Sequence, residues 1–135
     1  MKLKRLVLTG AAGRLGSYLR EPLSQLCDEL VSSDMVESLG PLYAGERYQR
    51  ADLTDKAAIH ALLAGADMVV HFGAISDEAT FEDILGPNII GAYNVWEAAH
   101  QQGLRRVVYA SSIHAVGMYP KAEFIGTDVP HRPDT

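Results

Sequence analysis

The sequence has 135 residues, a net charge of −5, a hydrophobic content of 47% and one cysteine. This length predicts a single domain with a proper core, but it is short for a dehydrogenase that carries its own substrate lobe. The negative charge and the lack of a basic run argue against binding to nucleic acid or to an anionic membrane. Apolar runs are too short for a membrane span or a signal peptide. The lone Cys27 rules out an internal disulfide and a thiolate metal cluster, so we expect no metal and a cytoplasmic location.

A glycine-rich loop follows the first predicted strand, Lys4 to Thr9, and precedes a helical pattern. Gly10 suits a tight strand-to-helix turn, Gly13 lets the main chain approach a pyrophosphate, and Gly16 allows close packing of the helix on the strand. The N-terminus of the helix presents unpaired N–H groups to an anionic bridge. The pattern therefore predicts a dinucleotide-binding turn, and a tight turn without a ligand is the alternative.

A second predicted strand, Glu29 to Asp34, ends in a carboxylate. This acid stands about twenty residues beyond the glycines, where such folds bind the adenosine ribose diol. A solvated loop carboxylate or a helix cap is the alternative. A carboxylate there repels a 2′-phosphate and so favours NAD over NADP. Arg14 is a candidate partner of the pyrophosphate or of a 2′-phosphate, and otherwise a solvated residue at the helix start.

The remaining chain alternates helices with strands. The predicted helices are Arg14–Leu26, with Pro22 as a candidate kink, Lys56–Leu63, and a stretch that starts near Asn88 and ends at Gly103. The predicted strands are Glu46–Ala51, Ala66–Phe72 and Arg106–Ala110, and Val107-Val108-Tyr109 is typical of a buried strand; the residues after Ser112 have no period and are predicted to form a loop. Alternation of this kind predicts the α/β class, a Rossmann-type doubly wound parallel sheet with strand order 3-2-1-4-5.

Chemistry-bearing residues follow the carboxyl end of each predicted strand, where open parallel sheets bind their ligands. They are Gly10, Asp34, Asp52, Ser76 and Ser112. We expect Asp52 to bond the adenine edge, or else to serve as a turn or capping residue. The five positions together predict a ligand site along this edge of the sheet.

Several motifs together resemble the extended, epimerase/dehydratase-like branch of the short-chain dehydrogenase/reductase superfamily. They are the Gly-x-x-Gly-x-x-Gly spacing of residues 10–16, Asp52-Leu53, His71-Phe72-Gly73-Ala74, Asn88-Ile89-Ile90-Gly91-Ala92-Tyr93-Asn94, Ser111-Ser112 and Asp128–Pro133. Within that branch, Gly73–Ser76, Ile84–Gly91 and Ser111–His114 are most similar to the uronate dehydrogenases. Those enzymes oxidise C1 of galacturonate or glucuronate with NAD to give the aldarolactone.

The resemblance implies roles by position. Ser112 is implied as the catalytic serine, and Ser76, Ser112, Ile113 and His114 as contacts of the sugar acid, although uronate dehydrogenases usually carry asparagine where this chain has Ile113. With the loop pattern, it predicts these cofactor-binding residues: Gly10, Gly13, Arg14, Leu15, Gly16, Asp34, Asp52, Leu53, Phe72, Gly73, Ala74, Ile75 and Asn88. On the residues alone, strand-end hydroxyls, a loop histidine and a helix cap are the alternatives.

The superfamily's Tyr-x-x-x-Lys is expected a few residues beyond Pro133, and the sequence ends at Thr135. We therefore expect residues 1–135 to be the N-terminal NAD-binding portion of a longer chain, inactive by itself. The tyrosinate base, its lysine, a sixth strand and a substrate lobe would lie in the remainder. A sugar-nucleotide epimerase or dehydratase, and a non-catalytic NAD-binding protein, are the alternatives, and the sequence leaves a homo-oligomer open.

Overall fold

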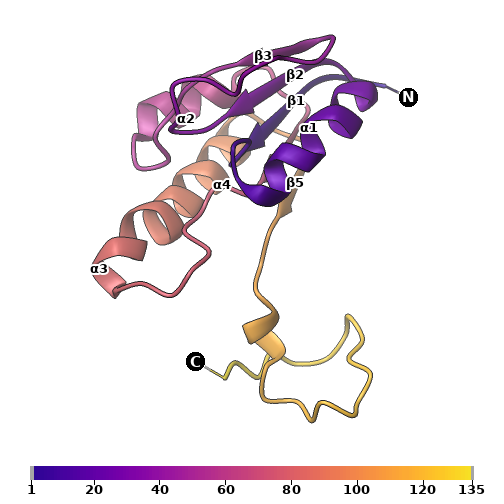
Figure 1. The fold of residues 1–135 in the computed structure, drawn as a ribbon, viewed down its shortest axis with the longest axis vertical. Coiled ribbons are helices and arrows are strands. Elements are labelled where there is room, and N and C mark those ends of the chain that lie inside the picture. The colour runs from indigo at the N-terminus through magenta and orange to yellow at the C-terminus, as the bar shows by residue number, and fades with distance from the viewer. Residues whose placement is uncertain (1, 135) are drawn as a thin grey trace.

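The computed structural model describes residues 2–134 (Figure 1). Its centre is a parallel five-stranded sheet in the order β3-β2-β1-β4-β5, as the sequence predicts. The strands are β1 (Leu3–Thr9), β2 (Cys27–Ser33), β3 (Glu46–Tyr48), β4 (Met68–His71) and β5 (Arg106–Tyr109). The helices are α1 (Arg14–Leu26), α2 (Lys56–Leu63), α3 (Phe81–Ile84) and α4 (Gly91–Gln101), with a π-helical turn η1 (Leu85–Ile90) and a 3-10 turn η2 (Ile113–Val116). None of the described helices has the length and apolarity needed to cross a membrane.

Helices cover both faces of the sheet, which is the doubly wound arrangement. On one face, Leu6 and Leu8 of β1 are buried with Leu23 of α1. On the opposite face, Val7 of β1 is buried with residues of α2 and α4, among them Val95. Successive residues of a strand point to opposite faces, so an unbroken apolar run is what a strand covered on both sides requires.

The edge strand β5 corrects one expectation. The run Val107-Val108-Tyr109 was predicted to be buried, but Val108 and Tyr109 are 41% and 44% exposed, because β5 pairs with β4 on one side only in the part of the chain that the structure describes. Apolar composition does not distinguish a central strand from an edge strand, since burial depends on neighbours that lie elsewhere in the sequence.

The helix predicted from Asn88 starts earlier. The chain turns helical at Phe81, where the Thr80 side chain accepts the N–H of Asp83, and it then passes through the π-helical turn η1 into α4. Gly86 and Pro87 look like helix breakers, but the wider π-helical turn accommodates them. The prediction was therefore wrong about where this helical segment begins.

Other boundaries differ by a few residues. β2 begins at Cys27 directly after α1, and α1 continues through Pro22 without interruption. β3 ends at Tyr48, although the N–H of Ala51 still donates to the carbonyl of Asp34. β4 and β5 are likewise shorter than the predicted strands Ala66–Phe72 and Arg106–Ala110.

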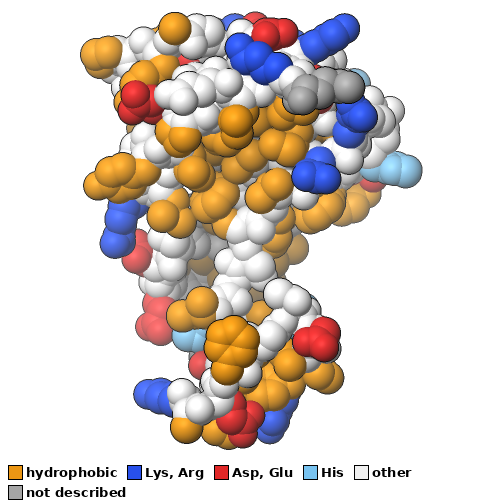
Figure 2. Space-filling view, turned by 90° about the vertical axis from the view of Figure 1, so that its right-hand side faces the viewer, with side chains coloured by type: hydrophobic (Ala, Val, Ile, Leu, Met, Phe, Trp, Pro, Cys, Tyr) orange, Lys and Arg blue, Asp and Glu red, His pale blue; other side chains and the backbone are white. Residues whose placement is uncertain are grey.

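Beyond β5 the chain leaves the sheet. Residues 111–134 form a small lobe that is joined to the main body by a narrow connection (Figures 1 and 2). The loop predicted here contains one short helical turn, η2, and Phe124 is 99% exposed within it. We call residues 111–134 the terminal lobe.

Candidate functional site

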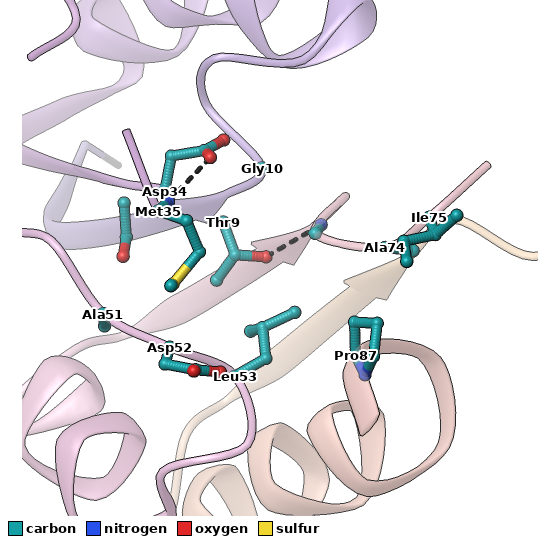
Figure 3. A pocket seen from close by; sticks show the side chains of 12 residues that line it. Thr9, Gly10, Asp34, Met35, Ala51, Asp52, Leu53, Ala74, Ile75 and Pro87 are labelled. Atoms are coloured by element: carbon teal, nitrogen blue, oxygen red, sulfur yellow. Dashed lines mark hydrogen bonds between the residues drawn. The ribbon is translucent and has the colours of Figure 1, made fainter. Parts of the chain in front are cut away.

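Two pockets adjoin at the carboxyl edge of the sheet. The first is lined by Thr9, Gly10, Ser33, Asp34, Met35, Ala51, Asp52, Leu53, Gly73, Ala74, Ile75 and Pro87 (Figure 3). The second is lined by Gly10, Gly13, Arg14, Leu15, Gly16, Phe72, Ala74, Ile75, Ser76, Asn88, Tyr109, Ala110, Ser111 and Ser112. Every predicted cofactor-binding residue lies in one of these two sets. The pockets share Gly10, Ala74 and Ile75, so one extended ligand could occupy both.

The glycine turn between β1 and α1 has little room for side chains. Gly10 has φ +71°, and a Cβ atom there would stand 2.5 Å from the carbonyl carbon of Phe72. A Cβ atom on Gly16 would overlap the carbonyl oxygen of Gly10. Gly10 thus makes the turn and Gly16 lets α1 approach it, as predicted. At Gly13 the nearest atom to a Cβ would be the Gly10 oxygen at 3.2 Å, so that position tolerates more.

The N-terminus of α1 faces the second pocket. Gly13 is the N-cap residue and makes no side-chain capping bond, and the first turn of α1 holds no acidic residue. The first N–H groups of a helix have no partner within it and carry a partial positive charge. An anion in the second pocket would meet these groups together with Arg14 and Leu15 from the same turn.

The Asp34 carboxylate lies where β2 ends, beside the glycine turn. Its Oδ2 accepts the N–H of Ala12 at 2.9 Å and its Oδ1 accepts the N–H of Met35 at 2.7 Å. These two bonds fix the orientation of the carboxylate at the first pocket, and Figure 3 draws the one to Met35. Each carboxylate oxygen can accept a second hydrogen bond, so both remain able to receive the hydroxyls of a ribose.

Asp52 forms a turn with Thr54 and is not a helix cap, since Asp55 is the N-cap residue of α2. Its Oδ1 accepts both the N–H and the hydroxyl of Thr54, each at 2.8 Å, and these bonds lower the pKa of Asp52. It also lines the first pocket, so the contact to an adenine edge stays a prediction. The loop after it is held by the buried Asn94, whose Nδ2 donates to the carbonyl of Leu53 at 2.9 Å. Leu53 in turn packs at 2.9 Å from where a Cβ of Gly73 would stand.

Asn88 forms hydrogen bonds with the backbone of Ile75, a residue that lines both pockets. Its Oδ1 accepts the N–H of Ile75 at 2.8 Å and its Nδ2 donates to the carbonyl of Ile75 at 2.9 Å. The π-helical turn η1 presents this amide to the loop that contains Ile75. Both ends of the amide are therefore occupied by the protein backbone, and Asn88 shapes the Ala74–Ser76 wall in addition to lining the second pocket.

The predicted substrate residues separate into two groups. Ser76 and Ser112 line the second pocket, whereas Ile113 and His114 are in neither pocket, and Ile113 is 84% exposed. Ser112 is the N-cap of η2 and its Oγ accepts the N–H of His114 at 3.1 Å. The Nδ1 of His114 lies 2.7 Å from Oδ1 of Asp134, so that imidazole is oriented within the terminal lobe.

Sequence reasoning missed several lining residues. Thr9, Met35 and Pro87 contribute to the first pocket, and the sequence analysis assigns none of them to a site. Each lies next to a predicted site position at a strand end or helix start, so proximity to those positions was the available signal. What they do depends on side-chain direction, which the sequence does not display.

The comparisons with known proteins agree with this geometry. A sequence profile described as the NAD dependent epimerase/dehydratase family matches residues 6–134. The chain is 47% identical over 134 residues to a uronate dehydrogenase of Pseudomonas putida, an alignment that covers 97% of this chain and 49% of the relative. The chain thus spans about half the length of the curated relatives it matches.

Solved structures lead to the same group of enzymes. A mutant of uronate dehydrogenase from Agrobacterium tumefaciens complexed with NAD matches with a TM-score of 0.88 at 48% identity, covering 97% of this chain and 49% of that chain. A glucuronic acid dehydrogenase from Chromohalobacter salexigens matches with a TM-score of 0.91 at 47% identity, covering 98% and 50%.

Proposed function

The chain belongs to the NAD-dependent epimerase/dehydratase family, and from this premise we propose that it supplies the NAD-binding part of a dehydrogenase that oxidises a hexuronate at C1 to the aldarolactone. One observation carries the proposal: the second pocket brings the glycine turn, the Ala74–Ser76 wall and Ser112 together. The glycine turn provides an anion site, and Ser112 provides a hydroxyl beside that site. The level of identity to uronate dehydrogenases supports the choice of substrate.

The residues present fit a dinucleotide. Gly10 and Gly16 let the turn pack closely against the neighbouring backbone, and the N-terminus of α1 meets an anion without a competing side-chain cap. Asp34 keeps acceptor capacity for a ribose diol. Adenosine would then occupy the first pocket, the pyrophosphate the N-terminus of α1, and the nicotinamide the second pocket, near Ser112.

When bound, the nicotinamide of NAD supplies a hydride acceptor. The chain's own residues would orient the sugar and stabilise the negative charge that develops on its reacting oxygen. Ser112 Oγ accepts the N–H of His114, which leaves the hydroxyl proton free to be donated. Donation toward the oxygen on C1 would stabilise the negative charge that develops on this oxygen as its O–H bond breaks. The general base is proposed to lie outside residues 1–135, together with the rest of the sugar site. A cytoplasmic location and a homo-oligomer are proposed on the sequence alone.

Cofactor choice tests the first half of this proposal. For the longer enzyme that we propose, we expect calorimetric titration to give at least about tenfold tighter binding of NAD than of NADP, because a 2′-phosphate would meet the Asp34 carboxylate. Asp34→Asn keeps an oxygen for the N–H of Ala12 and removes the charge, so it should narrow the gap, as should Asp34→Ala. NADP binding as tight as NAD binding would contradict the assignment of Asp34.

Turnover tests the second half. NADH formation should be measured with galacturonate and glucuronate, and in parallel with a nucleotide-linked sugar, on this chain and on the longer chain we propose. We expect hexuronate oxidation by the longer chain and none by residues 1–135 alone. Turnover of the nucleotide-linked sugar in place of hexuronates would favour an epimerase or dehydratase. Steady turnover by residues 1–135 would place the base among them and overturn the proposal.

A further inference from the structure

His71 is a buried titratable residue to which the proposed reaction gives no role. It ends β4, is 2% exposed, and lies between β1 and β5 in the sheet. Burying a polar ring is costly unless the protein replaces the hydrogen bonds that water provided. The partners of this imidazole therefore indicate what it does.

One hydroxyl joins the His71 ring to the loop that lines the pockets. Thr9 Oγ1 lies 2.6 Å from Nδ1 of His71 and accepts the N–H of Gly73 at 3.2 Å (Figure 3 draws the second bond). A hydroxyl has one proton, and since Thr9 Oγ1 accepts the N–H of Gly73, that proton has a hydrogen-bond acceptor among the described residues only when Nδ1 of His71 is unprotonated. The neutral ring then carries its proton on Nε2. Burial lowers the pKa of His71 to about 4, which keeps the ring neutral at physiological pH.

The backbone and the ring face of His71 extend the same link to the neighbouring strands. The N–H of Phe72 donates to the carbonyl of Thr9 at 3.2 Å, and the N–H of Ala110 donates to the carbonyl of His71 at 3.1 Å. The ring also stacks on Tyr109, with centroids 5.5 Å apart. Three strand ends, those of β1, β4 and β5, are thus joined at one buried residue.

These contacts lie directly behind the two pockets. Thr9 and Gly73 line the first pocket and Tyr109 lines the second, while Gly10 begins the glycine turn immediately after Thr9. The packing is tight, since a Cβ on Gly73 would stand 3.3 Å from Thr9 Oγ1. The Thr9 hydroxyl is therefore one of the groups that hold the loop after β4 beside the glycine turn.

We propose that Thr9 and His71 form a positioning pair for the dinucleotide, in which the imidazole orients the Thr9 hydroxyl and the hydroxyl fixes the Gly73–Ile75 loop against the glycine turn. This inference rests on the proposed function. A dinucleotide spans both pockets and so depends on their separation, whereas AMP occupies only the first. Neither side chain takes part in the chemistry, because both act through backbone that lines the pockets.

A matched pair of variants tests the proposal. Thr9→Val keeps the shape of the side chain and removes the hydroxyl, and Thr9→Ser keeps the hydroxyl. We expect calorimetric titration of Thr9→Val to show an NAD affinity about tenfold lower, with a smaller loss for AMP, and Thr9→Ser to restore most of the NAD affinity. A purely structural role would lower the unfolding midpoint without separating NAD from AMP, and that result would overturn the proposal.

Nitrogen-15 spectra of the His71 imidazole test the pair without any ligand. In the unaltered protein at neutral pH we expect the proton on Nε2 and a bare Nδ1, with a shifted signal in Thr9→Val and a restored one in Thr9→Ser. A proton on Nδ1 in the unaltered protein would contradict the pair even if Thr9→Val failed to fold. Absence of NAD binding by the unaltered protein would overturn the proposed function and this inference with it, whereas unchanged NAD affinity in Thr9→Val would overturn the inference alone.

Discussion

The strand ends of the sheet and the terminal lobe hold their candidate site residues in different ways. Thr9 and His71 are each 2% exposed and bonded across strands, whereas Ser112 is exposed and caps a single short turn. Among the described residues, the hydrogen bonds of residues 112–134 join members of that same stretch, such as Arg132 N–H to the Ala115 carbonyl at 2.9 Å. The proposed cofactor side is therefore set by the core, and the proposed catalytic side by local contacts. Changes at the strand ends should cost stability, while changes in the lobe should alter chemistry alone.

The largest expected effect is at the glycine turn. Gly10 and Gly65 have nearly the same φ, +71° and +70°, but a Cβ on Gly65 would meet nothing within 4 Å. Gly65→Ala should therefore cost about 1–2 kcal/mol of unfolding free energy, from backbone strain alone. Gly10→Ala adds a collision with the backbone at Phe72 and should cost more than about 4 kcal/mol or prevent folding. Urea titrations of both variants measure the difference, and equal losses would mean that the turn is not tightly packed.

A change in the terminal lobe should show the opposite pattern. In the longer enzyme that we propose, Ser112→Ala should lower turnover by about 10²- to 10³-fold because an oxyanion donor is lost. Its unfolding free energy and its NAD affinity should stay close to those of the unaltered enzyme. Ser111→Ala is the control and should cost much less turnover. A larger effect at Ser111 would mean that the catalytic assignment is off by one position.

Acidification should weaken the strand ends through His71. Burial lowers its pKa from 6.5 to about 4, so the unfolded chain takes up a proton first as the pH falls. The stabilisation is thus fully present above pH 6.5 and is lost as the pH falls toward 4, a contribution of about 3 kcal/mol in total. His71→Gln should flatten the pH dependence of unfolding over this window. Parallel curves for the two proteins would show that His71 is not buried neutral.

The smallest effect is expected from the pair of His114 and Asp134. Their side chains are 58% and 32% exposed, and exposed ion pairs contribute little. Asp134→Asn should change the unfolding free energy by less than about 1 kcal/mol and leave NAD affinity unchanged. Thermal unfolding and NAD titration check both statements. A cooperative loss of stability would indicate that the lobe is part of the folded core, which would erase the difference between the two regions.

The sequence by itself determined the glycine turn, the strand order and the acid after β2. Gly10 and Gly16 are local requirements of backbone angle and close packing, and an apolar run bounded by turn residues predicts a strand, although not whether that strand is central or at an edge. Asp34 then follows from its distance along the chain. These features could be predicted because each depends on neighbours within a few residues or on a fixed repeat.

Tertiary structure decided which side chains meet. Thr9 and His71 are 62 positions apart, and Arg20 is 26 positions from Glu46, whose carboxylate it binds through Nε at 2.8 Å in the interior. Asn88 reaches Ile75 only because a π-helical turn carries Pro87 where a break was predicted. Contacts between distant residues leave no period in the sequence, since they depend on how strands align and on where a turn widens. The linkage of the pockets through His71 therefore became visible only in the folded chain.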